Sequence, residues 1–557
     1  MATYFVRPDA SHGGANDGTS YADAWQGFSS INWTTLRGDV NTIYVCGTHG
    51  RWQILSKTNN GNLTTARGDY PGDPGVIDGD TLQSIQHNNT DDILYKNLTL
   101  TSASDDIAYV YGGSSNITFE NCVFIDGSRA IFYTTILAAR EMTGLTVRDC
   151  TVYGQSSNGI QIQCDNAVTQ DISDITISGC EVYNLGGRGI ILSSNATDSA
   201  VHTALIENTS VHDCGVIQEL NGVSIRTTAT GVLTTTPEAI KPYGVIVDNC
   251  TFYGNGYVGI EFSATTNTNN QPCILRNSLI YDNCQGATLD AGNVENIGCK
   301  GLIVEDCEIH TFVAPSQFDG VGLWMDLTFS AANALAPTEC IYQRNKIYNH
   351  TFDTSFSAWD AAESNTNIGG PGIHILGGNN NKVIGNVIYG NTTGIQLRVH
   401  DNSSQTPSGN EIVNNTFVNN TVVGIALIDI DDTTNIIENN IFYGGEYGLL
   451  DTSAWADEEW GGANGYATKT ISNNNFFGQS IGAIAGATGI TNTDPVTTDP
   501  QLDSNYNLST TSTCLAAGVK WWTGPNPSGY NGEPFSDFDT DIGANQSTHS
   551  PFHPVNL

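Results

Sequence analysis

A seven-residue pattern recurs thirteen times along this chain and constrains its fold more than any other feature. The pattern is an apolar residue, two mostly polar residues, a Cys or Asn (in places Ser or Thr), any residue, an apolar residue and usually an aromatic. Clear copies begin at Phe119, Val147, Ile177, Val247, Val304, Val383, Ile412 and Ile437. One structural unit is therefore repeated over residues 93–478.

The fourth position of the pattern forms a column that is rich in cysteine and asparagine. Its members are Asn97, Cys122, Cys150, Cys180, Thr209, Cys250, Ser278, Cys307, Asn345, Asn386, Asn415, Asn440 and Asn474. The average step is about 31 residues, which is typical of stacked solenoid units. Apolar and polar residues alternate within each copy, which indicates strands. A second strand follows most copies and begins with a Gly-Ile pair or a relative of it, as at Gly189 and Gly222.

The repetition of strand, turn, strand and loop predicts an all-β fold, a parallel β-helix of about 13 coils. We expect residues 1–92 to be a capping segment with the first coils, 93–478 the repeats and 479–557 a closing segment. Equivalent residues of such coils stack about 4.8 Å apart, so the Cys/Asn column should form a buried ladder. The aromatic column, with Tyr153, Tyr183 and Tyr253, should stack likewise, or alternatively binds carbohydrate.

Composition narrows the classes of partner. The formal net charge is −37, from 57 acidic and 20 basic residues, and no basic run exists, so nucleic acid is not an expected partner. The 13 cysteines show no metal-ligand spacing, and neither a metal site nor a cofactor is predicted. The first eight residues lack the apolar core of a signal peptide, and no stretch approaches 18 apolar residues. We therefore expect synthesis in the cytoplasm and no membrane insertion.

Three regions of the chain resemble a known group of proteins. The motifs lie at residues 4–8, 16–20, 24–25, 38–39 and 43–45 near the start and at 499–502, 506–508, 516–518 and 541–544 near the end. They resemble the opening and closing segments of right-handed parallel β-helix proteins of the pectate-lyase-like superfamily, and the repeats resemble the coils of those proteins. This resemblance implies a right-handed helix and a polysaccharide ligand.

Together with the missing signal peptide, the chain looks most like a bacteriophage tailspike. That resemblance implies a homotrimer in the virion tail, made in the host cytoplasm and acting outside the cell. It also implies contacts with other virion tail proteins and binding, with hydrolysis, of host cell-surface polysaccharide. The coils begin near residue 1, so attachment would use another protein or residues 519–557. Two alternatives stay open: a non-catalytic adhesin or structural virion appendage, and a bacterial polysaccharide lyase or hydrolase.

Long steps in the column direct the search for a site to the middle coils, because insertions form loops beside a solenoid. Aligning the second strands places outward-facing residues in columns. One column holds Ser224, Glu261, Thr288, His374 and Gln396, and the next holds Arg226, Ser263, Asp290, Trp324 and Arg398, with Asp326 two residues after Trp324.

Glycoside hydrolysis requires two carboxyl groups on either side of the scissile bond. Strand geometry places the Cα atoms of Glu261 and Asp290 roughly 8 Å apart, and Asp326 is a third candidate. Glu261, Asp290 and Asp326 are therefore the predicted catalytic residues, and retention or inversion stays open.

Five further residues are predicted to bind the substrate: Arg226, Trp324, His374, Arg398 and Trp359. Tryptophan stacks on sugar rings, although the loop that carries Trp359 suits a subunit contact equally well. A lyase would need a cation and a base, for which Arg226, Arg398, Lys241 and His374 are available. The strong negative charge would repel a polyuronate, so hydrolysis is the favoured reaction.

Overall fold

The structure is a computed structural model. It describes residues 2–8, 14–36, 39–55, 62–137, 140–165, 169–194, 199–216, 220–227, 241–285, 292–311, 320–327, 335–351, 370–399, 406–428, 430, 434–451, 470–486, 491–518 and 541–544. The chain forms two compact units, Met1–Cys273 and Ile274–Leu557.

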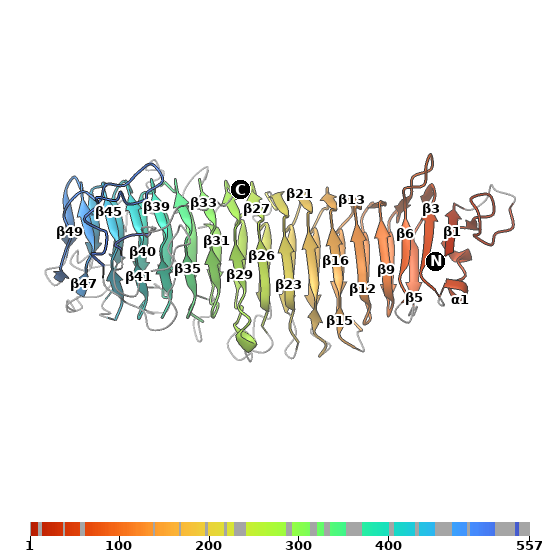
Figure 1. Ribbon diagram of the computed structural model, residues 1–557. Coiled ribbons are helices and arrows are strands. Elements are labelled where there is room, and N and C mark those ends of the chain that lie inside the picture. Colours follow the sequence, from red (N-terminus) through yellow and green to blue (C-terminus); the bar gives the residue numbers. More distant parts are fainter. Residues whose placement is uncertain are drawn as a thin grey trace. The chain divides into compact units, whose positions relative to one another are not determined.

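The first unit is built from three sheets whose strands run parallel from one coil to the next (Figure 1). The first sheet contains β1 (Ala2–Arg7), β2 (Trp25–Gln26), β3 (Asn41–Val45), β6 (Thr64–Arg67), β9 (Asp91–Lys96), β12 (Ser115–Glu120), β16 (Leu145–Arg148), β20 (Ile175–Ser178), β23 (His202–Glu207) and β26 (Tyr243–Asp248). The second contains β4 (Thr48–His49), β7 (Val76–Asp78), β10 (Thr99–Ser102), β13 (Val123–Asp126), β17 (Thr151–Tyr153), β21 (Glu181–Leu185), β24 (Ser210–Cys214) and β27 (Thr251–Tyr253). The third contains β5 (Trp52–Leu55), β8 (Ile85–Asn88), β11 (Ala108–Tyr111), β14 (Ile131–Thr134), β18 (Ile160–Cys164), β22 (Ile190–Ser194), β25 (Val223–Thr227) and β28 (Ile260–Ser263).

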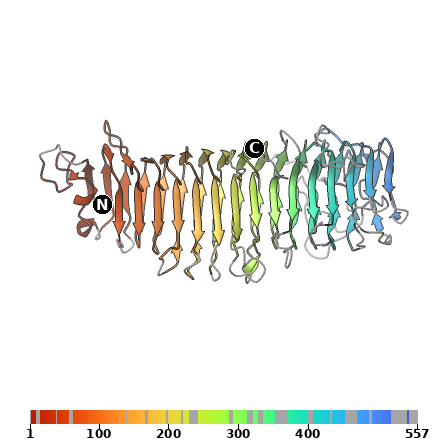
Figure 2. The ribbon, with the colours of Figure 1, turned by 180° about the vertical axis from the view of Figure 1, so that it is seen from behind.

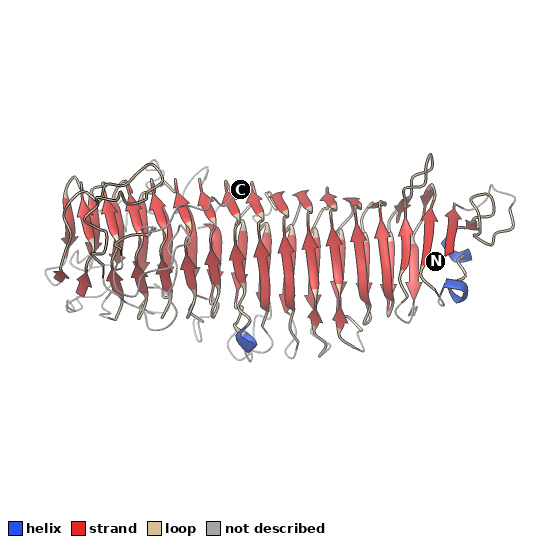
Figure 3. Cartoon of the chain, in the orientation of Figure 1, coloured by secondary structure: helices blue, strands red, loops and turns tan. Residues whose placement is uncertain are grey.

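Outside these sheets, the first unit has one extra strand pair, β15 (Met142–Thr143) with β19 (Ile172–Ser173). Helix is scarce among its described residues, as the colouring in Figure 3 shows: α1 (Trp33–Leu36) and the 3-10 turns η1 (Phe28–Ser30) and η3 (Thr268–Asn270).

The second unit repeats the same three-sheet plan. Its first sheet contains β29 (Ile274–Arg276), β32 (Ile303–Glu305), β35 (Ile341–Gln343), β38 (Lys382–Ile384), β41 (Glu411–Val413), β44 (Ile436–Glu438), β47 (Thr470–Ser472) and β50 (Thr491–Thr493). The second contains β30 (Leu279–Tyr281), β33 (Glu308–His310), β36 (Lys346–Tyr348), β39 (Val387–Tyr389), β42 (Thr416–Val418), β45 (Ile441–Tyr443) and β48 (Asn475–Phe477). The third contains β31 (Gly292–Ile297), β34 (Val321–Asp326), β37 (Pro371–Leu376), β40 (Thr393–Arg398), β43 (Val423–Ile428), β46 (Tyr447–Asp451) and β49 (Gly482–Gly486). The predicted all-β parallel β-helix is confirmed, and Figure 2 shows the coils of each unit from behind.

Short turns connect the first sheet to the second. Asn121 and Asp149 occupy the left-handed region, with φ of 50° and 54°, directly before the ladder residues Cys122 and Cys150. Asn and Asp tolerate this conformation better than other non-glycine residues, because their short side chains bond to the local backbone. This explains why a polar residue usually precedes the Cys or Asn of the repeated pattern.

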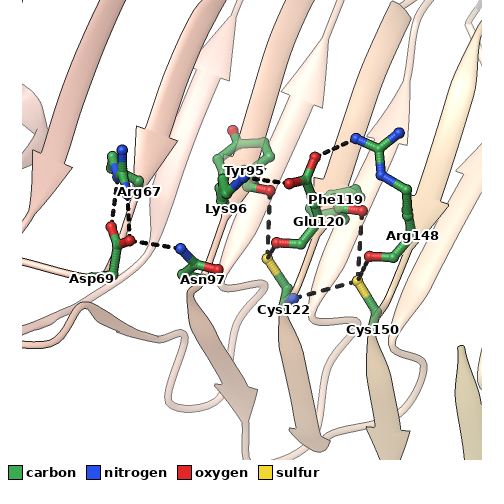
Figure 4. A network of polar contacts seen from close by, with 10 residues as sticks. All are labelled: Arg67, Asp69, Tyr95, Lys96, Asn97, Phe119, Glu120, Cys122, Arg148 and Cys150. Atoms are coloured by element: carbon green, nitrogen blue, oxygen red, sulfur yellow. Dashed lines mark hydrogen bonds and ion pairs between the residues drawn. The ribbon is translucent and has the colours of Figure 1, made fainter. Parts of the chain in front are cut away.

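The predicted ladder is present, with thiols in the first unit (Figure 4). The amide nitrogen of Cys122 donates to Sγ of Cys150 over 3.4 Å, and that thiol donates to the carbonyl oxygen of Phe119 over 3.5 Å. One member of the column was wrong. Because Tyr95 pairs with Phe119, the residue equivalent to Cys122 is the buried Leu98, and Asn97 is the turn residue before it. All thirteen cysteines of the chain are buried free thiols.

Asparagine forms the ladder in the second unit, and two ladders are present there that the repeated pattern did not predict. The predicted one runs through Asn345, Asn386, Asn415, Asn440 and Asn474. The others run through Asn381, Asn410 and Asn435 and through His350, Asn391 and Asn420. Each amide accepts from the coil before it and donates to the coil after it, so the buried polar groups of three bends are satisfied.

The aromatic column stacks along the second sheet. In the first unit the ring centroids of Tyr183 and His212 lie 5.1 Å apart, and those of His212 and Tyr253 lie 4.5 Å apart. In the second unit Tyr348 and Tyr389 lie 4.6 Å apart. The rings face one another rather than a ligand, which favours the stacking interpretation over a sugar-binding stripe.

Candidate functional site

The outward face of the third sheet in the first unit carries a group of hydrogen-bonding side chains. Strand pairing places Gln161, Ile191, Ser224 and Glu261 in one column and Gln163, Ser193, Arg226 and Ser263 in the next. Inward-facing residues such as Ile162, Leu192 and Ile225 alternate with them and are fully buried in the core. The predicted pairings of Ser224 with Glu261 and of Arg226 with Ser263 are confirmed.

A third column precedes these strands. It consists of the residues directly before the glycine that opens each strand, as at Gly189 and Gly222. A Cβ atom on Gly189 would lie 2.3 Å from Cγ1 of Val211, and one on Gly222 would lie 2.6 Å from Nδ2 of Asn255. Only glycine fits these tight entrances to the third sheet. Tight packing of Gly189 and Gly222 fixes the backbone there, so the preceding residues, Arg188 and Asn221, are held beside the outward face.

Glu261 is 7% exposed and lies among groups that complement a negative charge. Nδ2 of Asn221 donates a hydrogen bond to Oε2 of Glu261. The guanidinium of Arg188 lies close enough to interact electrostatically with Glu261 and with Arg226. Burial, and then the positive charge of Arg226, lower the pKa of Arg188 to about 10.

The amides next to this cluster are joined to one another. Nδ2 of Asn158 donates to Oε1 of Gln161 over 2.9 Å, and Nε2 of Gln161 donates to Oε1 of Gln163 over 2.7 Å. Oδ1 of Asn158 also accepts from the backbone nitrogen of Arg188 over 3.0 Å. We call Asn158, Gln161, Gln163, Arg188, Asn221, Ser224, Arg226 and Glu261 the polar face of the first unit.

The second unit holds four of the predicted site residues on the outward face of its third sheet. Trp324 pairs with His374, which pairs with Gln396, and their rings are stacked with centroids 6.2 Å apart. The predicted alignment of Trp324 with Arg398 was wrong, since Arg398 pairs with Leu376 in the next column. The unequal loops between the strands caused a shift of two residues in the sequence alignment.

Burial dominates the chemistry of this second group. Trp324 is 8% exposed, His374 4%, Asp326 3% and Arg398 8%. Burial, and then the charge of Arg398, lower the pKa of His374 to about 3, so the imidazole is neutral at physiological pH. Nε1 of Trp324 and both ring nitrogens of His374 have no hydrogen-bond partner among the described residues. Oδ1 of Asp326 accepts from the backbone nitrogen of Leu327 over 2.6 Å.

Two predicted residues, Asp290 and Trp359, lie outside the described residues. The roles predicted for Glu261, Asp326, Arg226, Trp324, His374 and Arg398 stay predictions. The sequence patterns did not predict Arg188 and Asn221 as site residues. Both immediately precede the glycine that opens a third-sheet strand, so aligning the residue before that glycine would have found them.

A shallow hollow of about 660 Å³ is found elsewhere on the first unit. It is lined by Asp91, Asp92, Ser115, Asn116, Arg140, Glu141, Thr143 and Gln170. Arg140 pairs with Asp91, and Asn116 donates to Asp92 over 3.0 Å, so these polar groups already bind one another. Within the described ranges, no cluster of three or more His, Cys, Asp or Glu side chains is arranged to hold a metal ion. The helices found there are all too short and too polar to cross a membrane.

One comparison with known proteins bears directly on the fold. A family model described as "Right handed beta helix region" matches residues 77–236. Among curated proteins, no sequence matches this chain.

Solved structures that are similar to the chain have low sequence identity. The A-module of the mannuronan C-5 epimerase AlgE4 of Azotobacter vinelandii is 14% identical, with a TM-score of 0.38, over 87% of this chain and 98% of that one. PfbA, a surface adhesin of Streptococcus pneumoniae, is 12% identical, with a TM-score of 0.43, over 76% of this chain and 92% of that one. Tailspike protein 3 of bacteriophage CBA120 is 11% identical, with a TM-score of 0.38, over 87% of this chain and 61% of that one. The chain is a parallel β-helix protein with a right-handed β-helix region at residues 77–236.

Proposed function

We propose that this protein binds polysaccharide along the polar face of the first unit, as a tailspike-like virion protein that binds and hydrolyses host cell-surface glycan. One observation carries the proposal. Side-chain amides, guanidinium groups, a hydroxyl and a carboxylate are placed in register on consecutive parallel strands of a rigid sheet. Sugars present closely spaced hydroxyl groups that donate and accept hydrogen bonds, and a repeating row of such partners suits a repeating polymer.

Two stacked aromatic rings lie on neighbouring strands of the same face. Tyr109 pairs with Phe132, and their rings stack with centroids 5.5 Å apart. Phe132 pairs in turn with Gln161 of the polar face. Because these rings face one another and Phe132 is only 7% exposed, they border the polar face and are not assigned as a platform on which a sugar stacks.

Glu261 is the carboxylate that the proposal assigns to chemistry in the first unit. The amide of Asn221 and the nearby Arg188 complement its negative charge. Hydrolysis requires one ionised carboxylate as nucleophile or general base and a second carboxyl group as acid, and we assign Glu261 one of these two roles.

A lyase is less compatible with the described groups. Its base must remove a sugar C5 proton, and His374, with a pKa of about 3, is too weak a base for that step.

Burial of the carboxylates favours one other candidate function. Glu261 is 7% exposed and Asp326 3%, which suits an adhesin whose acidic groups only hold the structure together. Such an adhesin would bind glycan without cleaving it.

One experiment separates binding from hydrolysis. The full chain is incubated with a panel of purified bacterial lipopolysaccharides and capsular polysaccharides, and both pull-down of glycan and release of reducing ends are measured. The proposal expects both, with Glu261→Gln abolishing release by at least 100-fold while pull-down persists. If the unsubstituted protein pulls down glycan but releases no reducing ends, the protein is an adhesin. If it pulls down no glycan, the proposal is refuted.

A matched control is Glu141→Gln, which removes an exposed carboxylate of the same unit. This variant should release reducing ends at the unsubstituted rate. Circular dichroism and the melting temperature show whether each variant is folded.

A further inference from the structure

Two arginines of the polar face lack the carboxylate partner that four other arginines of the first unit have. Arg67 pairs with Asp69, Arg129 with Asp106, Arg140 with Asp91 and Arg148 with Glu120. No described residue forms an ion pair or a side-chain hydrogen bond with the guanidinium group of Arg188 or Arg226. Their Nε atoms are both buried without a hydrogen-bond partner.

A shortage of carboxylates in the chain does not explain why these two arginines form no ion pair with the described residues. The chain has 57 acidic residues against 20 basic ones. The carboxylate that interacts electrostatically with Arg188 is Glu261, and the Oε2 atom of that carboxylate already accepts a hydrogen bond from Asn221. The two arginines also repel each other, since the charge of Arg226 disfavours the cationic form of Arg188.

Partly buried guanidinium groups without an anion destabilise a folded protein, because desolvation is not offset by pairing. Binding a ligand anion would offset it. The planar fork of N–H donors on arginine matches the two oxygens of a carboxylate. Ser224, one column from Arg226, adds a buried Oγ atom that has no hydrogen-bond partner among the described residues.

We propose that Arg188 and Arg226 form a subsite for the carboxylate of an acidic sugar in the bound polysaccharide, an inference that rests on the proposed function. The pair provides positive charge on a protein whose formal net charge is −37. Without such a subsite the overall field would repel an acidic glycan; with it, the carboxylate selects the register of the polymer on the face.

The test uses four acidic monosaccharides, glucuronate, galacturonate, mannuronate and N-acetylneuraminate, each compared with a neutral counterpart in which the carboxylate is reduced to the alcohol. Binding to the full chain is measured by ligand-observed NMR. We expect at least one acid to bind tenfold or more tightly than its counterpart, and Arg188→Gln with Arg226→Gln to remove that preference. The control is Arg67→Gln with Arg148→Gln, which removes the same charge from paired positions and should keep the preference.

Three outcomes would overturn the inference. The first is equal binding of every acid and its reduced counterpart. The second is an acid preference that survives in the Arg188/Arg226 double variant. The third is competition by sulfate or phosphate, at matched ionic strength, as strong as that by the sugar acid, which would mean a general anion site.

Stability gives an independent readout. If the two arginines await a ligand, the double variant without sugar melts at the same temperature as the unsubstituted protein or higher. A melting temperature several degrees lower would show that they are structural and would overturn the inference. Glycan pull-down, measured in parallel, tests the proposed function separately: pull-down without acid preference refutes only the subsite.

Discussion

Nδ2 of Asn345 donates a hydrogen bond of 3.0 Å to Oδ1 of Asn386, the equivalent residue one coil further along. Oδ1 of Asn386 also accepts from the backbone nitrogen of Asn345 over 2.8 Å. The amide of Asn386 then donates to Asn415 and to the carbonyl oxygen of Tyr342. One fully buried side chain therefore satisfies polar groups of three coils.

Replacing Asn386 by alanine should destabilise the protein strongly. The substitution removes a hydrogen-bond partner from two buried donors and two buried acceptors. We therefore expect the free energy of unfolding to fall by about 3 kcal/mol. Urea denaturation followed by circular dichroism measures this. Asn505→Ala, at an exposed position in the same unit, is the control and should cost less than about 0.5 kcal/mol. Equal losses in the two variants would contradict the role of the ladder.

The thiol ladder of the first unit should be chemically inert in the folded protein. Hydrogen bonds between neighbouring thiols, and then burial, raise the pKa values of Cys150 and Cys180, and burial raises that of Cys46 to about 12. Because the thiolate is the reactive form, an aromatic disulfide reagent should label none of the thirteen cysteines at pH 8. All thirteen should react in urea. Rapid labelling of a native thiol would show that the core opens.

Much of the fold could be predicted because each coil repeats the same local signals. Column residues such as Cys122 and Asn386 follow a left-handed turn, and their spacing along the chain gives the stacking directly. The error at Asn97 arose because the ladder position there is Leu98, which lacks the Cys or Asn signature. The ladders through Asn391 and Asn410 were missed because they occupy bends outside the repeated pattern.

The site was less predictable than the fold. Glu261 and Arg226 were placed correctly relative to Ser224 and Ser263 because the loops between those strands did not change the register. Loops of different lengths shifted Trp324 by two residues. Whether an arginine forms an ion pair depends on the direction of its side chain. The spacing of residues in the sequence therefore does not show that Arg148 pairs with Glu120 while no described carboxylate pairs with Arg188.

The ion pairs on the first sheet should make stability depend on acid pH (Figure 4). Glu120 accepts from both Lys96 and Arg148, and these hydrogen bonds lower the pKa of its carboxyl group. A carboxyl group with a lowered folded pKa stabilises the protein above its ordinary pKa of 4.5 and loses that contribution as pH falls through the folded value. Glu120→Gln should cost about 1 kcal/mol at pH 7 and progressively less below pH 4.5.

Denaturation midpoints at several pH values test this, with Glu141→Gln as the exposed control. A cost for Glu120→Gln that is unchanged at pH 2 would mean that the carboxylate charge is not what stabilises the first sheet.

The buried His374 predicts a second effect of pH on stability, which comes from a basic group rather than from a carboxyl group. Its folded pKa of about 3 lies below the ordinary value of 6.5, so the unfolded chain binds a proton that the folded protein excludes. Stability should therefore fall as pH drops from about 6.5 toward 3, by about 2 kcal/mol at pH 5 from this residue alone. His374→Phe keeps an aromatic ring against Trp324 and removes the titration. Relative to the unsubstituted protein, this variant should gain stability at pH 5 and show no such gain at pH 8. An equal difference at both pH values would show that His374 titrates normally and is open to solvent.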